Sequence, residues 1–208
     1  RPIEANTSWD DAHFESCGQQ WMLLAEPRYA VALVNQSSYG HDVSPAGGDE
    51  HIPTMGVMAR LTLLRSPQSP DPHPDQGCHH LVYSLLTDAR VESAHVEAAR
   101  LNQPLQVRSG TVELPSTARI EPVHGTAVID AVKQAFDGSG DLVIRIHEAE
   151  GARSRVRLLL DRDGCVSEVD LLEDPIDEPT QQLPASTCSR VELTLRPFQI
   201  LTLRVSQR

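Results

Sequence analysis

The sequence predicts an all-β protein made of two antiparallel β-sandwich units, the first of them incomplete, with one short helix between them. Apolar and polar residues alternate along most of the chain with a period of two, which is typical of half-buried strands. Proline (15 residues) and glycine (12 residues) separate these runs along all 208 residues. Turns at intervals of about 8–12 residues favour sandwiches over alternating α/β units. Aromatic residues make up only 4% of the chain, so valine, leucine and isoleucine are expected to form the cores.

The first half of the chain contains the predicted helix and three clear strand patterns. The helix covers residues 91–101, because Ala94, Ala98 and Leu101 recur at helical spacing and Pro104 follows soon after. The three predicted strands cover residues 29–34, 59–64 and 80–86.

The second half has the cleaner strand pattern. Asp163-Gly164 has the composition of a hairpin turn, so the flanking apolar runs are predicted as two separate strands. Pro197 lacks a backbone N–H, which suits an edge or a bulge between the last two strands. The predicted strands cover residues 126–135, 142–149, 156–160, 166–172, 191–195 and 198–205.

The domain boundary is predicted in the weakly patterned stretch of residues 105–122, which contains Pro115 and Pro122. This divides the chain into residues 1–110 and residues 111–208.

Charge and composition exclude several classes of protein. The net charge of −11 argues against a nucleic-acid backbone or an anionic membrane surface as the main partner. No run of about 18 apolar residues is present, so no membrane span is predicted. The chain begins at Arg1 without a signal segment, and we expect it to be part of a longer polypeptide. The absence of a C-x-x-C spacing favours four reduced thiols in a cytoplasmic protein, although it leaves open a disulfide among Cys17, Cys78, Cys165 and Cys188.

The sequence contains no self-contained catalytic or metal-binding motif. Neither a G-x-S-x-G nucleophile motif nor a glycine-rich phosphate loop is present. His73-Pro74-Asp75 could present two ligands from one loop, but two ligands do not make a metal site. His79 and His80 would point to opposite faces of a strand, so they are not expected to share an ion. We therefore expect no catalytic residue, metal or cofactor site in this chain.

Two segments have the composition of a sugar-binding surface. The first is the proline-rich loop that ends in Asp75, Gln76 and Gly77, where a carboxylate and an amide could bind hydroxyl groups. The alternative is a capped hairpin in which Asp75 accepts backbone N–H groups. The second segment places Trp9 beside Asp10, with Glu15 nearby, so that stacking could accompany hydroxyl binding. Trp21 also lies nearby, and the alternative for both tryptophans is ordinary core packing.

Many short motifs, in the same order, resemble the C-terminal region of glycoside hydrolase family 38 α-mannosidases, of the cytosolic and bacterial subgroup. The resemblance covers nearly the whole chain, and no single motif decides it. The matching residues are Arg1-Pro2, Asn6-Thr7-Ser8-Trp9-Asp10, Phe14-Glu15, Trp21, Glu26, Tyr39-Gly40-x-Asp42, Leu64-Arg65-Ser66-Pro67, Pro70-Asp71-Pro72, Asp75-Gln76-Gly77, Val132-Lys133-Gln134-Ala135, Asp137-Gly138, Glu148-Ala149, Gly151, Leu195-Arg196-Pro197-Phe198 and Thr202-Leu203.

The resemblance implies a function for the longer protein. Enzymes of this family are zinc-dependent, retaining exo-α-mannosidases that act on mannose-containing oligosaccharides. Their nucleophile and zinc ligands belong to an N-terminal barrel that no segment of this chain resembles. Residues 1–110 would then be the end of a large super-β-sandwich, and residues 111–208 a terminal small β-sandwich. The resemblance implies that Asp75, Gln76 and Gly77, and secondly Trp9, Asp10 and Glu15, help to line the sugar site.

Two alternatives remain open. The chain could be a stand-alone carbohydrate-binding sandwich, which would bind mannosides without a barrel. It could also be an assembly domain whose outer surface forms a homo-oligomer, although the acidic charge weakly opposes close self-association.

Overall fold

The computed structural model describes residues 15–45, 56–105, 107, 109–110 and 118–206. Contacts divide the chain into two compact units, residues 2–107 and residues 108–208. The predicted boundary between residues 110 and 111 lies close to this division. The described residues form antiparallel strands with one helix, so the all-β prediction is confirmed.

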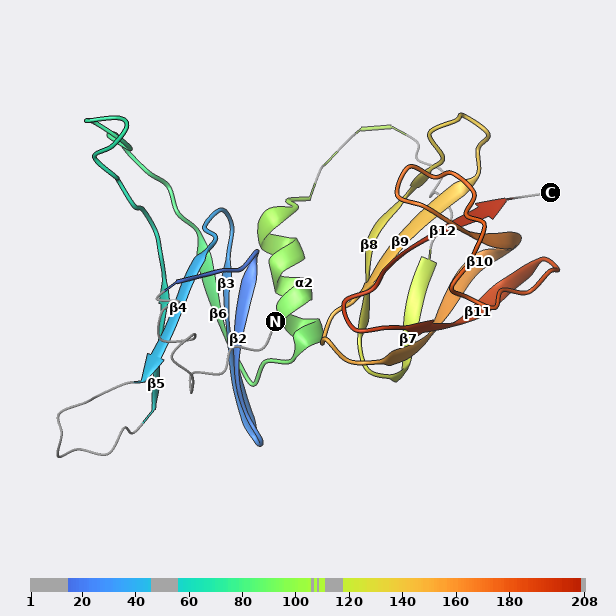
Figure 1. Ribbon diagram of the computed structural model, residues 1–208, viewed down its shortest axis with the longest axis horizontal. Helices are drawn as coiled ribbons and strands as arrows, with labels where there is room; N and C mark the ends of the chain where they lie inside the picture. The colour runs from blue at the N-terminus through green and yellow to red at the C-terminus, as the bar shows by residue number, and fades with distance from the viewer. Residues whose placement is uncertain (1–14, 46–55, 106, 108, 111–117, 207–208) are drawn as a thin grey trace. The chain divides into compact units, whose positions relative to one another are not determined.

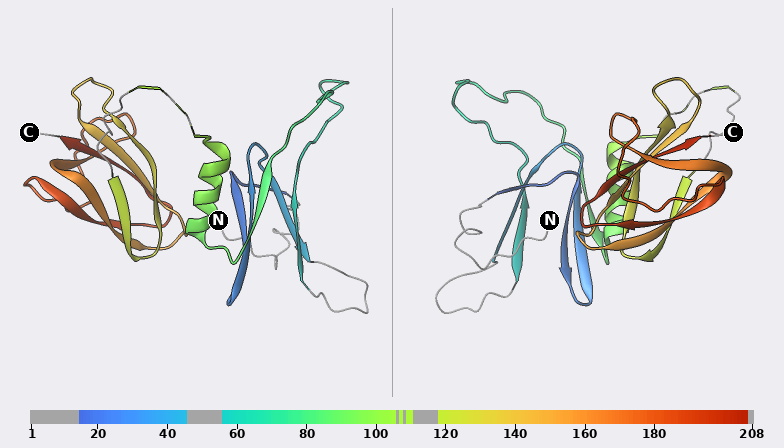
Figure 2. Two further views of the ribbon diagram at one scale, coloured as in Figure 1. Left: turned by 180° about the vertical axis from the view of Figure 1, so that it is seen from behind. Right: turned by 45° about the vertical axis from the view of Figure 1, so that its right-hand side comes forward.

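The first unit contains two three-stranded antiparallel sheets and the helix α2. In Figures 1 and 2 the sheet β2-β3-β6 lies between α2 on one side and the sheet β1-β4-β5 on the other. The elements are β1 (Ser16–Cys17), β2 (Trp21–Glu26), β3 (Tyr29–Asn35), β4 (Gly40–Pro45), β5 (Val57–Leu61), β6 (Tyr83–Thr87) and α2 (Val91–Asn102).

The helix α2 forms where its spacing predicts it and ends one residue later. Its small residues Ala94 and Ala98 are buried, which lets the helix approach the sheet closely. At its start, the backbone N–H of Arg90 donates to Ser93 Oγ at 2.8 Å, one half of a capping box. At its end, Asn102 Nδ2 donates to the carbonyl of Asn35 at 3.1 Å, which ties the helix to β3.

The buried core of the first unit is small in the part of the chain that the structure describes. Its fully buried members are only alanines and one valine, whereas Leu85 on β6 and Val57 on β5 keep 67% and 61% of their surface exposed. That the first sandwich is incomplete stays a prediction.

The second unit is a sandwich built around a single long strand. Its strand order is β11-β10-β12-β9-β8, and β7 also pairs with β10. Buried side chains alternate along β11, where Val191, Leu193 and Leu195 point into the core and Glu192 and Thr194 stay exposed. The strands are β7 (Ala118–His124), β8 (Ala127–Gln134), β9 (Leu142–Glu148), β10 (Ser154–Val169), β11 (Cys188–Leu195) and β12 (Ile200–Ser206).

The hairpin predicted at Asp163-Gly164 is wrong. β10 runs through this position, pairing with β7 and β11 in its first part and with β12 in its second. The pairing with β11 shifts between Leu159 and Gly164, as at a β-bulge. A Cβ on Gly164 would lie 2.4 Å from Val205 Cγ1, so the glycine permits close approach of β12. The chain therefore passes here from pairing with β7 and β11 to pairing with β12 without reversing.

Other strand boundaries also differ from the prediction. β5 ends at Leu61 and β6 begins at Tyr83, so the predicted strands at residues 62–64 and 80–82 belong to the connecting loop. Residues 170–172 form a turn instead of a strand end, because Asp170 Oδ1 accepts the backbone N–H groups of Leu172 and Asp174. β7 lies largely within the stretch predicted as the domain boundary. It pairs with β10 through an irregularity next to Pro122. β1, β2 and β4 were not predicted.

One buried carboxylate joins two turns of the second unit. Glu148 is fully buried, and its Oε1 accepts the Glu150 N–H at 3.0 Å and the Ser154 hydroxyl at 3.1 Å. Its Oε2 accepts the N–H of Gly151 at 2.8 Å and that of Phe198 at 3.0 Å. Burial raises the pKa of Glu148, but these four hydrogen bonds outweigh it, so the pKa lies below its ordinary value.

Candidate functional site

The proline-rich loop between β5 and β6 projects away from both sheets of the first unit (Figures 1 and 2). Asp75 closes it in two ways: its Oδ2 accepts the Ser66 N–H at 3.2 Å, and its carbonyl lies 2.7 Å from His79 Nε2. Asp75 has a φ of +54°, a conformation that aspartate and asparagine tolerate better than most residues. Asp75, Gln76 and Gly77 are all exposed. The loop is thus shaped by Asp75 and presents all three predicted residues to solvent.

Glu15 lies at the base of the same loop. Its Oε1 accepts the Thr62 hydroxyl at 2.6 Å, and its Oε2 forms an ion pair with the guanidinium of Arg65. The side chain of Glu15 is only 14% exposed. A Cβ at Gly40 would collide with the Glu15 carboxylate, so any larger residue at this position on β4 would displace Glu15. These contacts fix one carboxylate between β4 and the residues that follow β5.

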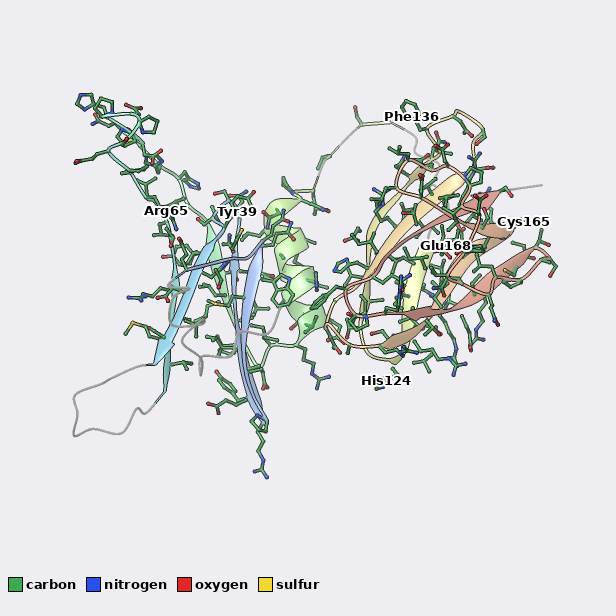
Figure 3. All side chains as sticks on the ribbon, viewed as in Figure 1. Tyr39, Arg65, His124, Phe136, Cys165 and Glu168 are labelled. Atoms are coloured by element: carbon green, nitrogen blue, oxygen red, sulfur yellow. The ribbon has the colours of Figure 1, made fainter. Side chains whose placement is uncertain are left out.

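Arg65 and Ser66 connect the two predicted segments. Arg65 pairs with Glu15, and the next residue, Ser66, donates its N–H to Asp75. Figure 3 shows Arg65 at the base of the loop, close to Tyr39. The structure therefore brings Glu15 and the start of the Asp75-Gln76-Gly77 loop to the same strand end.

A cavity of about 540 Å³ opens beside this strand end. Glu15, Thr62 and Arg65 form its polar wall, and Tyr39 lines it with 54% of its surface exposed. Asp75, Gln76 and Gly77 do not line it. Sequence reasoning missed Thr62, Arg65 and Tyr39 as members of a site. The available signal was the Tyr39-Gly40 pair, because a glycine beside an exposed aromatic residue permits close approach of another side chain.

The structure describes one of the two tryptophans. Trp9 and Asp10 lie outside the described residues. Trp21 is partly buried against the core of the first unit, and its ring meets that of His95 edge to face, with the ring centroids 5.1 Å apart. Trp21 therefore packs in the core, as the alternative interpretation of the tryptophans predicts.

The histidines of the loop do not form a metal site with their neighbours. His73 and His80 are exposed, and His79 contacts a backbone carbonyl. Within residues 15–45, 56–105 and 118–206, no group of three or more potential ligands is close enough to bind an ion.

None of the four cysteines is in a disulfide. The described part of the chain also contains no helix with the length and apolar character needed to cross a membrane.

The second unit has a larger cavity, of about 810 Å³, whose charged side chains are bonded within the protein. Arg204 Nε donates to Asp141 at 2.7 Å, and Arg204 Nη2 donates to Asp137 at 2.7 Å and to Ser139 Oγ at 3.0 Å. Glu168 accepts the backbone N–H groups of Thr180 and Gln181. These groups stabilise the loops around the cavity.

Acid is expected to destabilise the second unit through Asp137 and Glu148. Hydrogen bonds from Ser139 and Arg204 lower the pKa of Asp137 to about 2, and the pKa of Glu148 is also lowered. Both carboxylates are therefore more acidic when folded, and they stabilise the fold above their unfolded pKa values of about 4. This stabilisation is lost as the pH falls from about 4 towards 2. Urea unfolding at pH 7, 4 and 2.5 measures it.

Asp137→Asn is the matched variant for this titration. It is expected to be less stable than the wild type at pH 7 and to lose less stability between pH 4 and 2.5. An unchanged pH dependence would show that Asp137 does not contribute.

Two family models match this chain. The glycosyl hydrolases family 38 C-terminal domain matches residues 1–73, and the family 38 C-terminal beta sandwich domain matches residues 126–203. The chain belongs to the C-terminal region of glycosyl hydrolase family 38. The family predicted from the sequence motifs is thereby confirmed, and the second model coincides with strands β8–β12 of the second unit.

Named relatives of this family 38 chain are much longer than the chain itself. Alpha-mannosidase 2C1 of Homo sapiens is 35% identical over 98% of this chain and 19% of its own length. Alpha-mannosidase G of Dictyostelium discoideum is 34% identical over 73% of this chain and 14% of its own length. An alpha-mannosidase of Saccharomyces cerevisiae is 27% identical over 99% of this chain and 20% of its own length. The chain thus spans at most about a fifth of these relatives.

Proposed function

We propose that this chain is the non-catalytic C-terminal part of an α-mannosidase that removes terminal, non-reducing α-D-mannose residues from oligosaccharides. The observation that supports this most strongly is the pair of family 38 models, together with relatives named as alpha-mannosidases that match over 73–99% of the chain. We also propose that the protein acts in the cytoplasm, in keeping with its four unpaired cysteines.

The role we propose for the chain is to complete the sugar site and to stabilise a catalytic barrel in the same polypeptide. The loop that carries Asp75, Gln76 and Gly77 is stiffened by prolines and held by Asp75, so it could place hydroxyl-binding groups at a distance from its own sheets. Glu15 is held by Thr62 and Arg65 at the base of this loop. Trp9 and Asp10 are proposed as further contributors to the same surface. The exposed apolar side chains of the first unit are a surface for the barrel portion.

Zinc and the nucleophile of a retaining mechanism are proposed to belong to the remainder of the polypeptide. The described residues offer no ligand set for zinc, so no step of the reaction is assigned to the metal within this chain. The chain's own contribution is to orient hydroxyl groups and exclude water.

Mannose release from α-mannosides by the full-length polypeptide, with zinc present, tests this function. We expect the full-length protein to turn over the substrate and the isolated 208-residue chain to be inactive, because the chain contains no recognised nucleophile. Turnover by the isolated chain would contradict the proposal. If the full-length protein is inactive and the isolated chain binds mannosides with saturation, the chain is a carbohydrate-binding module instead.

A further inference from the structure

The cavity at the base of the proline-rich loop combines the two kinds of group that bind a sugar ring. Tyr39 offers an aromatic face, since it lines the cavity and is 54% exposed. Glu15, Thr62 and Arg65 offer hydrogen-bonding groups on the polar wall, and they are fixed by their contacts with one another. A carboxylate has about four acceptor positions, so Glu15 keeps capacity for a ligand hydroxyl after binding Thr62 and Arg65. The cavity volume of about 540 Å³ falls within the range of small-molecule sites.

Asp75, Gln76 and Gly77 do not line the cavity, although Asp75 accepts the N–H of Ser66, the residue that follows Arg65. Arg65 lies in the cavity wall, while Asp75, further along the same loop, is outside it. Figure 3 shows Arg65 and Tyr39 at the base of the loop, and Figure 1 shows the loop extending away from the strands. If the Asp75-Gln76-Gly77 segment contacts the terminal mannose that is removed, a further sugar bound in the cavity belongs to the remaining saccharide, because an exo-acting enzyme has no sugar beyond the terminal one.

We infer that the Tyr39 cavity is a binding subsite for a second or third sugar unit of the oligosaccharide, on the leaving-group side of the cleaved bond. In this subsite Tyr39 stacks on the C–H face of the sugar ring, and Glu15 and Arg65 bind its hydroxyl groups. The inference rests on the proposed function, and it adds that the chain selects substrates by the length of the saccharide.

The test compares two substrates in the full-length enzyme. An α-linked mannotriose fills the subsite, whereas α-mannosyl fluoride has no sugar beyond the reacting one. For Tyr39→Ala we expect the ratio of kcat/KM for mannotriose to kcat/KM for the fluoride to fall about 10-fold, the size of one lost aromatic contact. Tyr39→Phe keeps the ring and should keep most of the ratio. Tyr29→Ala is the matched control, because Tyr29 is 49% exposed and lies outside the cavity.

The outcomes separate this inference from the proposed function. A Tyr39→Ala ratio equal to that of the wild type would overturn the subsite, as would an equal loss with Tyr29→Ala. If the wild-type enzyme cleaves neither substrate, the proposed function itself fails. Thermal unfolding of each variant shows whether a lost activity reflects lost folding.

Discussion

Replacing Glu148 with alanine is expected to destabilise the second unit by at least about 3 kcal/mol, because the change leaves four donors without their acceptor. Three of these donors are backbone N–H groups, in the turn at residues 150–151 and at Phe198, and the fourth is the hydroxyl of the fully buried Ser154. Each buried donor left unsatisfied costs about 1–3 kcal/mol. Hydrogen–deuterium exchange of the amides in β9 and β12 measures the loss within this unit alone.

Glu148→Gln and Glu192→Gln are the controls for this prediction. Glutamine at position 148 keeps the shape and one acceptor oxygen, but its NH₂ group faces donors, so an intermediate loss is expected. Glu192 pairs with Arg155 and Arg157 with 50% of its side chain exposed, and Glu192→Gln should cost much less stability than Glu148→Ala because exposed ion pairs contribute little. Amide protection in Glu148→Ala equal to that of the wild type would show that the turns are held by other contacts.

Asp75→Ala is expected to lower kcat/KM of the full-length polypeptide for an α-mannoside about 10- to 100-fold, if the proposed function holds, while leaving its unfolding temperature close to that of the wild type. Alanine removes the acceptor for the Ser66 N–H and is less suited to the φ of +54° at this position. The loop is exposed, so the global fold should tolerate the change. A loop displaced by about 1 Å from a substrate typically costs a factor of about 100 in rate. Steady-state kinetics with an α-mannoside measure the effect.

Two further variants separate loop shape from sugar binding. Asp75→Asn keeps an acceptor and tolerates the same backbone conformation. If Asp75→Asn recovers the activity lost in Asp75→Ala, Asp75 acts by shaping the loop. If the loss persists, the charge of Asp75 contributes to substrate binding. Asp71→Ala is the matched control, because Asp71 is exposed in the same loop and its carboxylate accepts the nearby N–H of His73, at 2.8 Å. Kinetics of Asp75→Ala equal to those of Asp71→Ala would reject the loop as part of the sugar site.

The candidate site was only partly predictable, because its contacts join residues far apart in sequence. The composition of the proline-rich loop singled out Asp75, and the carboxylate beside an aromatic segment singled out Glu15. Neither pattern indicated that Arg65 and Ser66 would link the two. The aromatic residue that lines the cavity is Tyr39, whereas the sequence analysis proposed a tryptophan as the aromatic group of the sugar-binding surface.

Local patterns in the sequence determined the class of fold, the helix at residues 91–102 and most strands of the second unit, because alternation and helical spacing report which face of an element is buried. Motif order determined the family. Only the tertiary structure decided that β10 continues through Asp163-Gly164, since the turn signal is local and the pairing with β7, β11 and β12 is not. It also decided the role of Glu148. A glutamate in a strand pattern gives no local sign that it is buried, because its four donors come from turns that only folding brings together.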